Sequence, residues 1–111
     1  MPIIQKLLLV YKLWRGYFIH FDKLTKFGLG LKIELLFIET IQNNFTASYK
    51  TGSDKLVYLN KASDSLDLLK FILQVMWELK LLDNKKYITL SKSLEEIGRM
   101  LGGWQRKTRT P

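Results

Sequence analysis

The sequence predicts an all-α protein, an antiparallel up-down-up-down four-helix bundle. Its two prolines, Pro2 and Pro111, stand at the ends of the chain, so no residue between them forbids a helix. Apolar residues in four separate segments recur at intervals of three and four, which places them on one face of a helix. The segments are joined by short connections, which favour antiparallel neighbours.

The first helix is expected from about Ile3 to Asp22. Its apolar positions are spaced by three, four, three, four and three residues, which is typical of the core-facing stripe of a bundle. They are Ile4, Leu7, Tyr11, Trp14, Phe18 and Phe21. The following residues, Lys23 to Gly30, include two glycines, and we expect them to form a turn.

The second helix is expected from about Leu31 to Ser48. The apolar spacing predicts a buried stripe made of Leu31, Leu35, Ile38, Ile41 and Phe45. Outward positions are then assigned to Lys32, Glu39, Gln42 and Asn43. The segment from Tyr49 to Asp54 is expected to be a loop that ends in helix-capping residues.

The third helix, from about Asp54 to Leu81, carries two adjacent apolar stripes. One consists of Leu59, Ala62, Leu66, Leu69, Leu73 and Met76. The other consists of Leu68, Ile72, Val75, Leu79 and Leu82. So wide an apolar face predicts contacts on two sides, either within the bundle or in an oligomer.

The last helix is expected to begin after Asp83, which has the side chain of a typical N-cap. Its stripe repeats the three-four spacing without a break through Tyr87, Leu90, Leu94, Ile97, Leu101 and Trp104. A short basic tail, Gln105 to Pro111, is expected to fray. We therefore treat residues 1–111 as one four-helix domain.

The composition argues against catalysis. There is no cysteine, which excludes disulfides, thiolate zinc sites and cysteine nucleophiles and fits a reducing cytoplasm. The single histidine, His20, belongs to no metal-binding spacing, and we expect it on the surface or at a helix end. The sequence thus predicts a cytoplasmic protein that is not an enzyme and needs no cofactor.

Charge suggests the partners. The chain has 18 lysines and arginines against 10 acidic residues, a formal net charge of +8, so RNA, DNA or an acidic protein surface are the leading partners, with anionic lipid behind them. The alternative is that the charge only keeps the protein in solution. The apolar run from Leu7 to Tyr11 is flanked by Lys6, Lys12 and Arg15, so neither a signal peptide nor a membrane span is expected.

Four cations of the last helix are spaced by seven residues, which is two helical turns, so they follow one side about 10 Å apart. This basic row consists of Lys85, Lys92, Arg99 and Arg106. It can follow a nucleic-acid backbone, or it can be a solvated face beside the core-facing stripe. The spacing alone leaves both interpretations open.

Two glycines of the same helix, Gly98 and Gly102, lie four residues apart and cost roughly 1 kcal/mol each relative to alanine. We interpret them, together with Trp104, as positions of close helix packing within the bundle or across a subunit boundary. The alternative is a frayed end at which Gly102 and Gly103 terminate the helix.

The run from Ser93 to Trp104, read Ser-Leu-Glu-Glu-Ile-Gly-Arg-Met-Leu-Gly-Gly-Trp, resembles the closing motif of the accessory variability determinant (Avd) proteins of diversity-generating retroelements. The segments Tyr11–Trp14 and Lys26–Ile33 are also similar to elements of that family, in the same order. Where the family often has Phe-Pro-Arg, this chain has Phe21–Leu24.

A related group, the four-helix proteins encoded in ribosomal-RNA intervening sequences, usually has Asn-Ile-Ala-Glu-Gly in the second helix. This chain has Ile41–Phe45 there, so we favour the retroelement family. That resemblance implies a homopentameric accessory protein that binds a reverse transcriptase and supports mutagenic copying of a template RNA into cDNA. The alternative is a structural or protein-interaction bundle of the intervening-sequence type without a reverse-transcriptase partner.

Within that interpretation, we assign phosphate contacts to the basic row and to a second basic group on charge and placement. The second group consists of Lys12, Arg15, Lys23 and Lys26.

Overall fold

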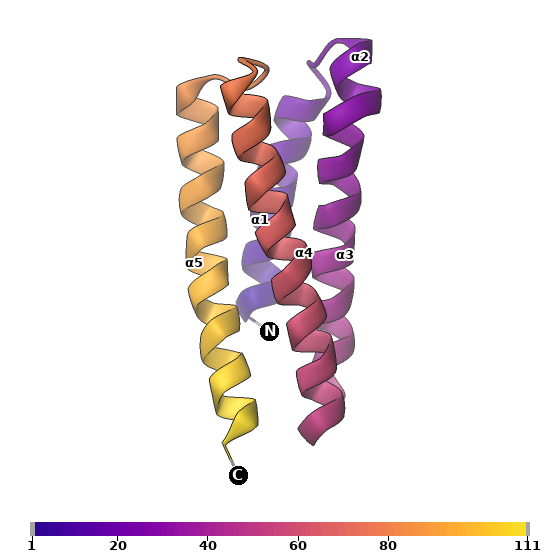
Figure 1. Ribbon diagram of the computed structural model, residues 1–111, viewed down its shortest axis with the longest axis vertical. Coiled ribbons are helices and arrows are strands. Elements are labelled where there is room, and N and C mark those ends of the chain that lie inside the picture. The colour runs from indigo at the N-terminus through magenta and orange to yellow at the C-terminus, as the bar shows by residue number, and fades with distance from the viewer. Residues whose placement is uncertain (1, 111) are drawn as a thin grey trace.

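Four long helices account for most of residues 2–110, the part of the chain that the computed structural model describes. They are α1 (Pro2–Phe18), α3 (Leu31–Ser48), α4 (Gly52–Glu78) and α5 (Asn84–Arg109), and these residues contain no strand (Figure 1). Each long helix runs antiparallel to the one before it. The predicted up-down-up-down four-helix bundle is confirmed.

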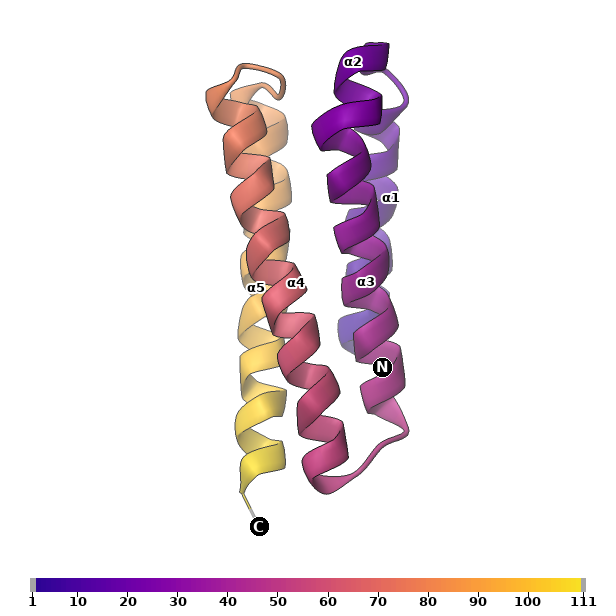
Figure 2. The same cartoon turned by 45° about the vertical axis from the view of Figure 1, so that its right-hand side comes forward.

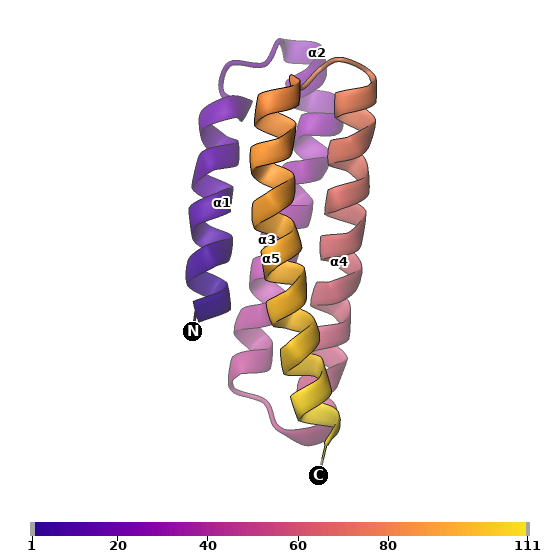
Figure 3. The ribbon, with the colours of Figure 1, turned by 90° about the vertical axis from the view of Figure 1, so that its left-hand side faces the viewer.

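The helices occupy the four corners of the bundle in chain order. α1 packs against α3 and α5, and α4 packs against the same two helices from the opposite corner (Figure 2). α1 has 17 residues, whereas α4 has 27 and α5 has 26. The amino-terminal end of α1 therefore lies short of the end at which α5 finishes, and that end of the bundle consists of α3, α4 and α5 alone (Figure 3).

The chain reverses at residues 19–22, before the predicted turn at residues 23–30, which is wrong because those residues are helical except for a kink at Gly28. A short helix, α2 (Lys23–Thr25), leads into a π-helical turn, η1 (Lys26–Gly30), and α1 ends at Phe18, before the expected Asp22. Gly30 is buried, and a Cβ there would lie 2.8 Å from the carbonyl oxygen of Thr25 and 3.1 Å from the Phe18 ring. Only glycine fits this close approach.

The core-facing stripes predicted for the first and last helices and the first stripe of the third are confirmed. Their members are buried or pack partly buried against the core. The second stripe of the third helix has a mixed outcome: Leu82 is buried, Ile72 packs against the core, and Leu68 and Leu79 are exposed. The largest fully buried side chains are Trp14 and Phe37.

The stripe predicted for the second helix is wrong. Leu31, Leu35, Ile38 and Phe45 are exposed, and only Ile41 packs partly buried against the core. The face of α3 that enters the bundle instead consists of Ile33, Glu34, Leu36, Phe37, Thr40, Asn44 and Ala47. Both faces carry apolar residues at helical spacing, so periodicity alone does not decide between them.

Most polar groups of the buried α3 face form hydrogen bonds, which offset their desolvation, whereas the Oδ1 atom of Asn44 is buried without a hydrogen-bond partner among the described residues. The hydroxyls of Thr40 and Ser65 lie 2.8 Å apart between α3 and α4. Thr40 also donates to the carbonyl of Leu36, and the Asn44 amide donates to the carbonyl of Thr40. These bonds explain why this face can be buried.

The carboxylate of Glu34 joins α3 to α1. Glu34 is 6% exposed and accepts hydrogen bonds from the Tyr11 hydroxyl at 2.8 Å, the Trp14 indole at 2.7 Å and the Arg15 guanidinium at 3.0 Å. The three donors lie within two turns of α1. A buried carboxylate without such donors would cost several kcal/mol, so this cluster determines which side of α3 faces α1.

The last helix begins as predicted, because Asp83 caps it by accepting a hydrogen bond from the backbone N–H of Lys86. The expected frayed tail is wrong. α5 continues to Arg109, and Pro111 lies outside the described residues. Trp104 packs against the core and Gln105 donates to Asn60 at 2.9 Å, which hold these turns to the bundle. Cations in the last turn also interact favourably with the helix dipole.

The Glu34 cluster predicts an alkaline loss of stability through Tyr11. Burial, and next the hydrogen bond to Glu34, raise the pKa of the Tyr11 phenol above its ordinary value of 10.0. Because the folded state favours the neutral phenol, this contribution is complete below about pH 10 and is lost as the pH rises through the folded-state pKa.

Replacing Tyr11 with Phe should lower the unfolding free energy at pH 7 by about 1.5 kcal/mol, as for other hydrogen bonds to charged groups. Urea titrations of both proteins should show this difference shrinking above pH 10. A difference that stays constant between pH 8 and pH 11 would contradict the role of the phenol.

Candidate functional site

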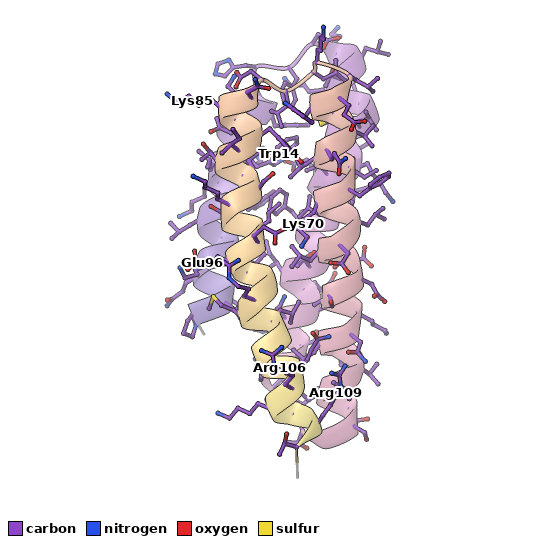
Figure 4. The ribbon with its side chains drawn as sticks, turned by 60° about the vertical axis from the view of Figure 1, so that its left-hand side comes forward. Trp14, Lys70, Lys85, Glu96, Arg106 and Arg109 are labelled. Carbon is purple, nitrogen blue, oxygen red and sulfur yellow. The ribbon has the colours of Figure 1, made fainter. Side chains whose placement is uncertain are left out.

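The basic row follows the outward side of α5. All four members are exposed, whereas Leu90, Leu94 and Leu101 on the opposite side are buried. Lys85 and Arg106 are 21 positions apart, which at 1.5 Å per residue is about 31 Å. Lys85 lies near the beginning of α5 and Arg106 near its end (Figure 4). The helix thus presents four cations over most of its length.

The two acids within this stretch of α5 are engaged by neighbouring helices. Glu95 accepts from Lys70 of α4 at 3.3 Å, and Glu96 pairs with Lys6 of α1. The hydrogen bond from Lys6 holds the pKa of the Glu96 carboxyl below its usual range. Among residues 2–110, no member of the basic row forms an ion pair. The acids therefore join helices, and the row remains available.

The second basic group is divided by the fold. Arg15 is paired with Glu34, and both Arg15 and Lys26 lie over the Phe18 ring, at 5.5 and 5.9 Å from its centroid. Lys12 and Lys23 are exposed, and neither makes an ion pair with another described residue. Arg15 therefore has a structural role that sequence reasoning missed.

Gly98 and Gly102 lie in a groove of about 420 Å³ between α4 and α5. A Cβ at Gly98 would make ordinary contacts, 3.7 Å from the Lys70 Nζ atom and 3.8 Å from Leu66, and one at Gly102 would lie 3.5 Å from Arg106. Neither glycine is therefore required for close helix packing within the bundle. Packing across a subunit boundary remains a prediction.

The end of the bundle without α1 combines lysines with aromatic rings. Lys55 lies over the Trp104 ring with its Nζ atom 5.0 Å from the centroid, and Lys61 lies over Tyr58 at the same distance. Lys50 lies 5.8 Å from the Tyr49 ring and also approaches Tyr58. Sequence reasoning missed Lys50, Lys55 and Lys61. Lys50 beside Tyr49 and Lys61 three residues after Tyr58 are close in the sequence and could have been found there. Lys55 and Trp104 are far apart in the sequence, and only the fold brings them together.

The remaining chemistry is sparse. Within residues 2–110, no cluster of three or more potential metal-ligating side chains occurs, and none of the helices is long and apolar enough to cross a membrane. His20 is exposed in the turn after α1, as predicted. Comparison with protein families, with curated proteins and with solved structures finds no match to this chain.

The open groove predicts that Gly98→Ala stabilises the isolated bundle. Alanine favours helix by about 0.5 to 1 kcal/mol over glycine, and its methyl group fits here. Thermal or urea unfolding of the variant should show this gain, and Gly102→Ala should behave alike. A loss of stability together with a smaller assembly mass would instead indicate that another subunit packs on Gly98.

Proposed function

We propose that this chain is an accessory protein of a diversity-generating retroelement, which binds a reverse transcriptase and the template RNA or its cDNA to support mutagenic reverse transcription. The protein works as a cytoplasmic homo-oligomer, a pentamer by the family resemblance, without an active site or cofactor of its own. The observation that carries the proposal is the basic row on α5, together with the run from Ser93 to Trp104 that contains part of it.

The basic row is suited to a nucleic-acid backbone because its charges are exposed and unpaired. Each cation that neutralises a phosphate releases counterions, and this gain dominates sequence-independent binding. The acids beside the row are held by Lys6 and Lys70, so they repel a polyanion less than free carboxylates would. The carboxyl end of a helix carries partial negative charge, which repels a phosphate. At this end of α5 the positive charges of Arg106, Lys107 and Arg109 offset that repulsion.

Self-association is supported by an apolar surface on the outside of α2, η1 and α3, which we call the outer stripe. Its members recur at helical spacing, and Leu24 and Phe27 are 84% and 72% exposed. The outer stripe consists of Leu24, Phe27, Leu31, Leu35, Ile38, Phe45 and Tyr49. Large apolar side chains that gather on the outside of a protein are typical of an interaction surface, so another copy of the chain is the proposed partner of the stripe.

The outer stripe also favours the alternative function, a structural or protein-interaction bundle of the intervening-sequence type. In that case the stripe binds a protein and the positive charge serves only solubility. Binding of RNA at several salt concentrations separates the two, because phosphate contacts must weaken steeply with salt.

Charge reversal tests the basic row. Changing Lys85, Lys92, Arg99 and Arg106 together to Glu should lower RNA affinity by orders of magnitude. With about 0.7 counterions released per contact on a single strand, the slope of log affinity against log salt should flatten by about 3. Filter binding at four salt concentrations measures both quantities, and circular dichroism checks helicity.

The matched control reverses two exposed lysines on other surfaces, Lys32 and Lys80, and is compared with the reversal of Lys92 and Arg99 in the row, which gives the same net charge. The control should keep most of the affinity. If the two variants lose affinity equally, only net charge matters. If the row variant binds like the wild type, the contact surface is elsewhere, with Lys12 and Lys23 the next candidates.

The outer stripe predicts the assembly. Light scattering should give several times the chain mass of 13.1 kDa for the wild type. Leu35→Glu with Ile38→Glu should shift it towards the monomer while helicity is retained, because both side chains are already exposed within one chain. Lys32→Glu, on another side of the same helix, should leave the assembly intact. A monomeric wild type at micromolar concentration would contradict the oligomer.

A further inference from the structure

The end of the bundle without α1 exposes a side of α5 that α1 covers higher up. Ser93, Glu96 and Ile97 line a small cavity together with residues of α1. Eleven residues make about three helical turns, so residues eleven positions further along α5 lie on the same side of the helix. They are Trp104, Lys107 and Thr108. α1 does not reach this end of the bundle (Figure 3), and here Lys107 is exposed while Trp104 and Thr108 are only partly buried.

These three residues and the beginning of α4 line an open pocket of about 360 Å³. Its α4 side is formed by Thr51, Gly52 and Lys55. Lys55 is four residues before the fully buried Leu59, so it continues the core-facing stripe of α4 with a charged side chain. The core therefore ends here in polar and cationic positions around one indole ring.

The lining of the pocket suits a base joined to an anionic group. Trp104 provides a flat apolar surface, and the Nζ atom of Lys55 lies 5.0 Å from its ring centroid. Lys107 is exposed beside it, and no acidic residue is among those that line the pocket. Arg106 and Arg109 lie at the same end of the molecule (Figure 4). The volume is within the range of about 300 to 1,000 Å³ that is usual for small-ligand sites.

We propose that this pocket binds one nucleotide of a single-stranded nucleic acid. The base stacks on the Trp104 ring and displaces the Lys55 ammonium, which then pairs with the phosphate together with Lys107. A base in a duplex is already paired and stacked, so the pocket selects unpaired segments or ends. The inference rests on the proposed function for the identity of the polymer, and it adds a selectivity that the basic row cannot supply.

The first test compares a 12-nucleotide RNA strand with its duplex by fluorescence anisotropy. Trp104→Leu should lower single-strand affinity by about 5- to 160-fold, the range for loss of one stacked base, and leave duplex affinity unchanged. Trp104→Phe, which keeps an aromatic ring, should retain most of the single-strand affinity. Lys55→Gln should weaken single-strand binding and flatten its salt dependence. Lys61→Gln, on the same helix, is the control and should leave the preference for single strands over the duplex unchanged.

The second test observes the pocket directly. Adenosine 5′-monophosphate titrated into the wild-type protein should shift the Trp104 indole N–H resonance in NMR spectra, which is assigned by its loss in Trp104→Phe. The Trp14 resonance, from a fully buried ring, serves as the internal control. This measurement does not depend on the basic row or on polymer binding.

The outcomes separate the two proposals. If the row variant loses RNA binding but folded Trp104→Leu keeps the wild-type preference for single strands, the pocket inference is overturned and the proposed function stands. If the mononucleotide shifts the Trp104 resonance while RNA affinity does not depend on the row, the pocket stands and the row is refuted. A mononucleotide that shifts no indole resonance, with equal single-strand and duplex affinities, also overturns the pocket.

Discussion

The carboxylate of Glu34 lies between α1 and α3, where it is almost fully buried and receives hydrogen bonds from Tyr11, Trp14 and Arg15. An ionised group in that position is tolerated only while its donors remain in place. The cluster therefore couples two properties of the bundle. It determines how α3 is rotated about its axis, and it determines the level along α3 at which α1 packs.

The rotation of α3 has a direct consequence for the surface. With Glu34 turned to α1 and Thr40 bonded to Ser65 of α4, the face of α3 that carries these polar groups together with apolar residues such as Phe37 is inside. The leucines and aromatic rings of the outer stripe then have no partner within one chain. α3 therefore carries apolar residues on two faces, and the face that stays outside is an apolar surface for another molecule.

The position of α1 along the bundle axis affects the surface of α5. α1 is shorter than α4 and α5, so one end of the bundle has three helices, and the indole of Trp104 is left only partly covered. At the same time, Lys6 of α1 and Lys70 of α4 pair with the acids of α5. The positions of the neighbours thus leave the outward cations unpaired and the aromatic end open, which together define the candidate nucleic-acid surface.

The sequence by itself determined the helices, the cap at Asp83 and three of the core-facing stripes, because helix formation and amphipathic spacing are local properties. It also determined the spacing of the basic row. Only the tertiary structure decided which apolar face of α3 enters the core, since two faces had suitable spacing and the choice depends on donors from α1 and α4. The pairing of Glu95 and Glu96 and the approach of Lys55 to Trp104 were decided in the same way. Each joins residues far apart in the chain, so no local pattern encodes it.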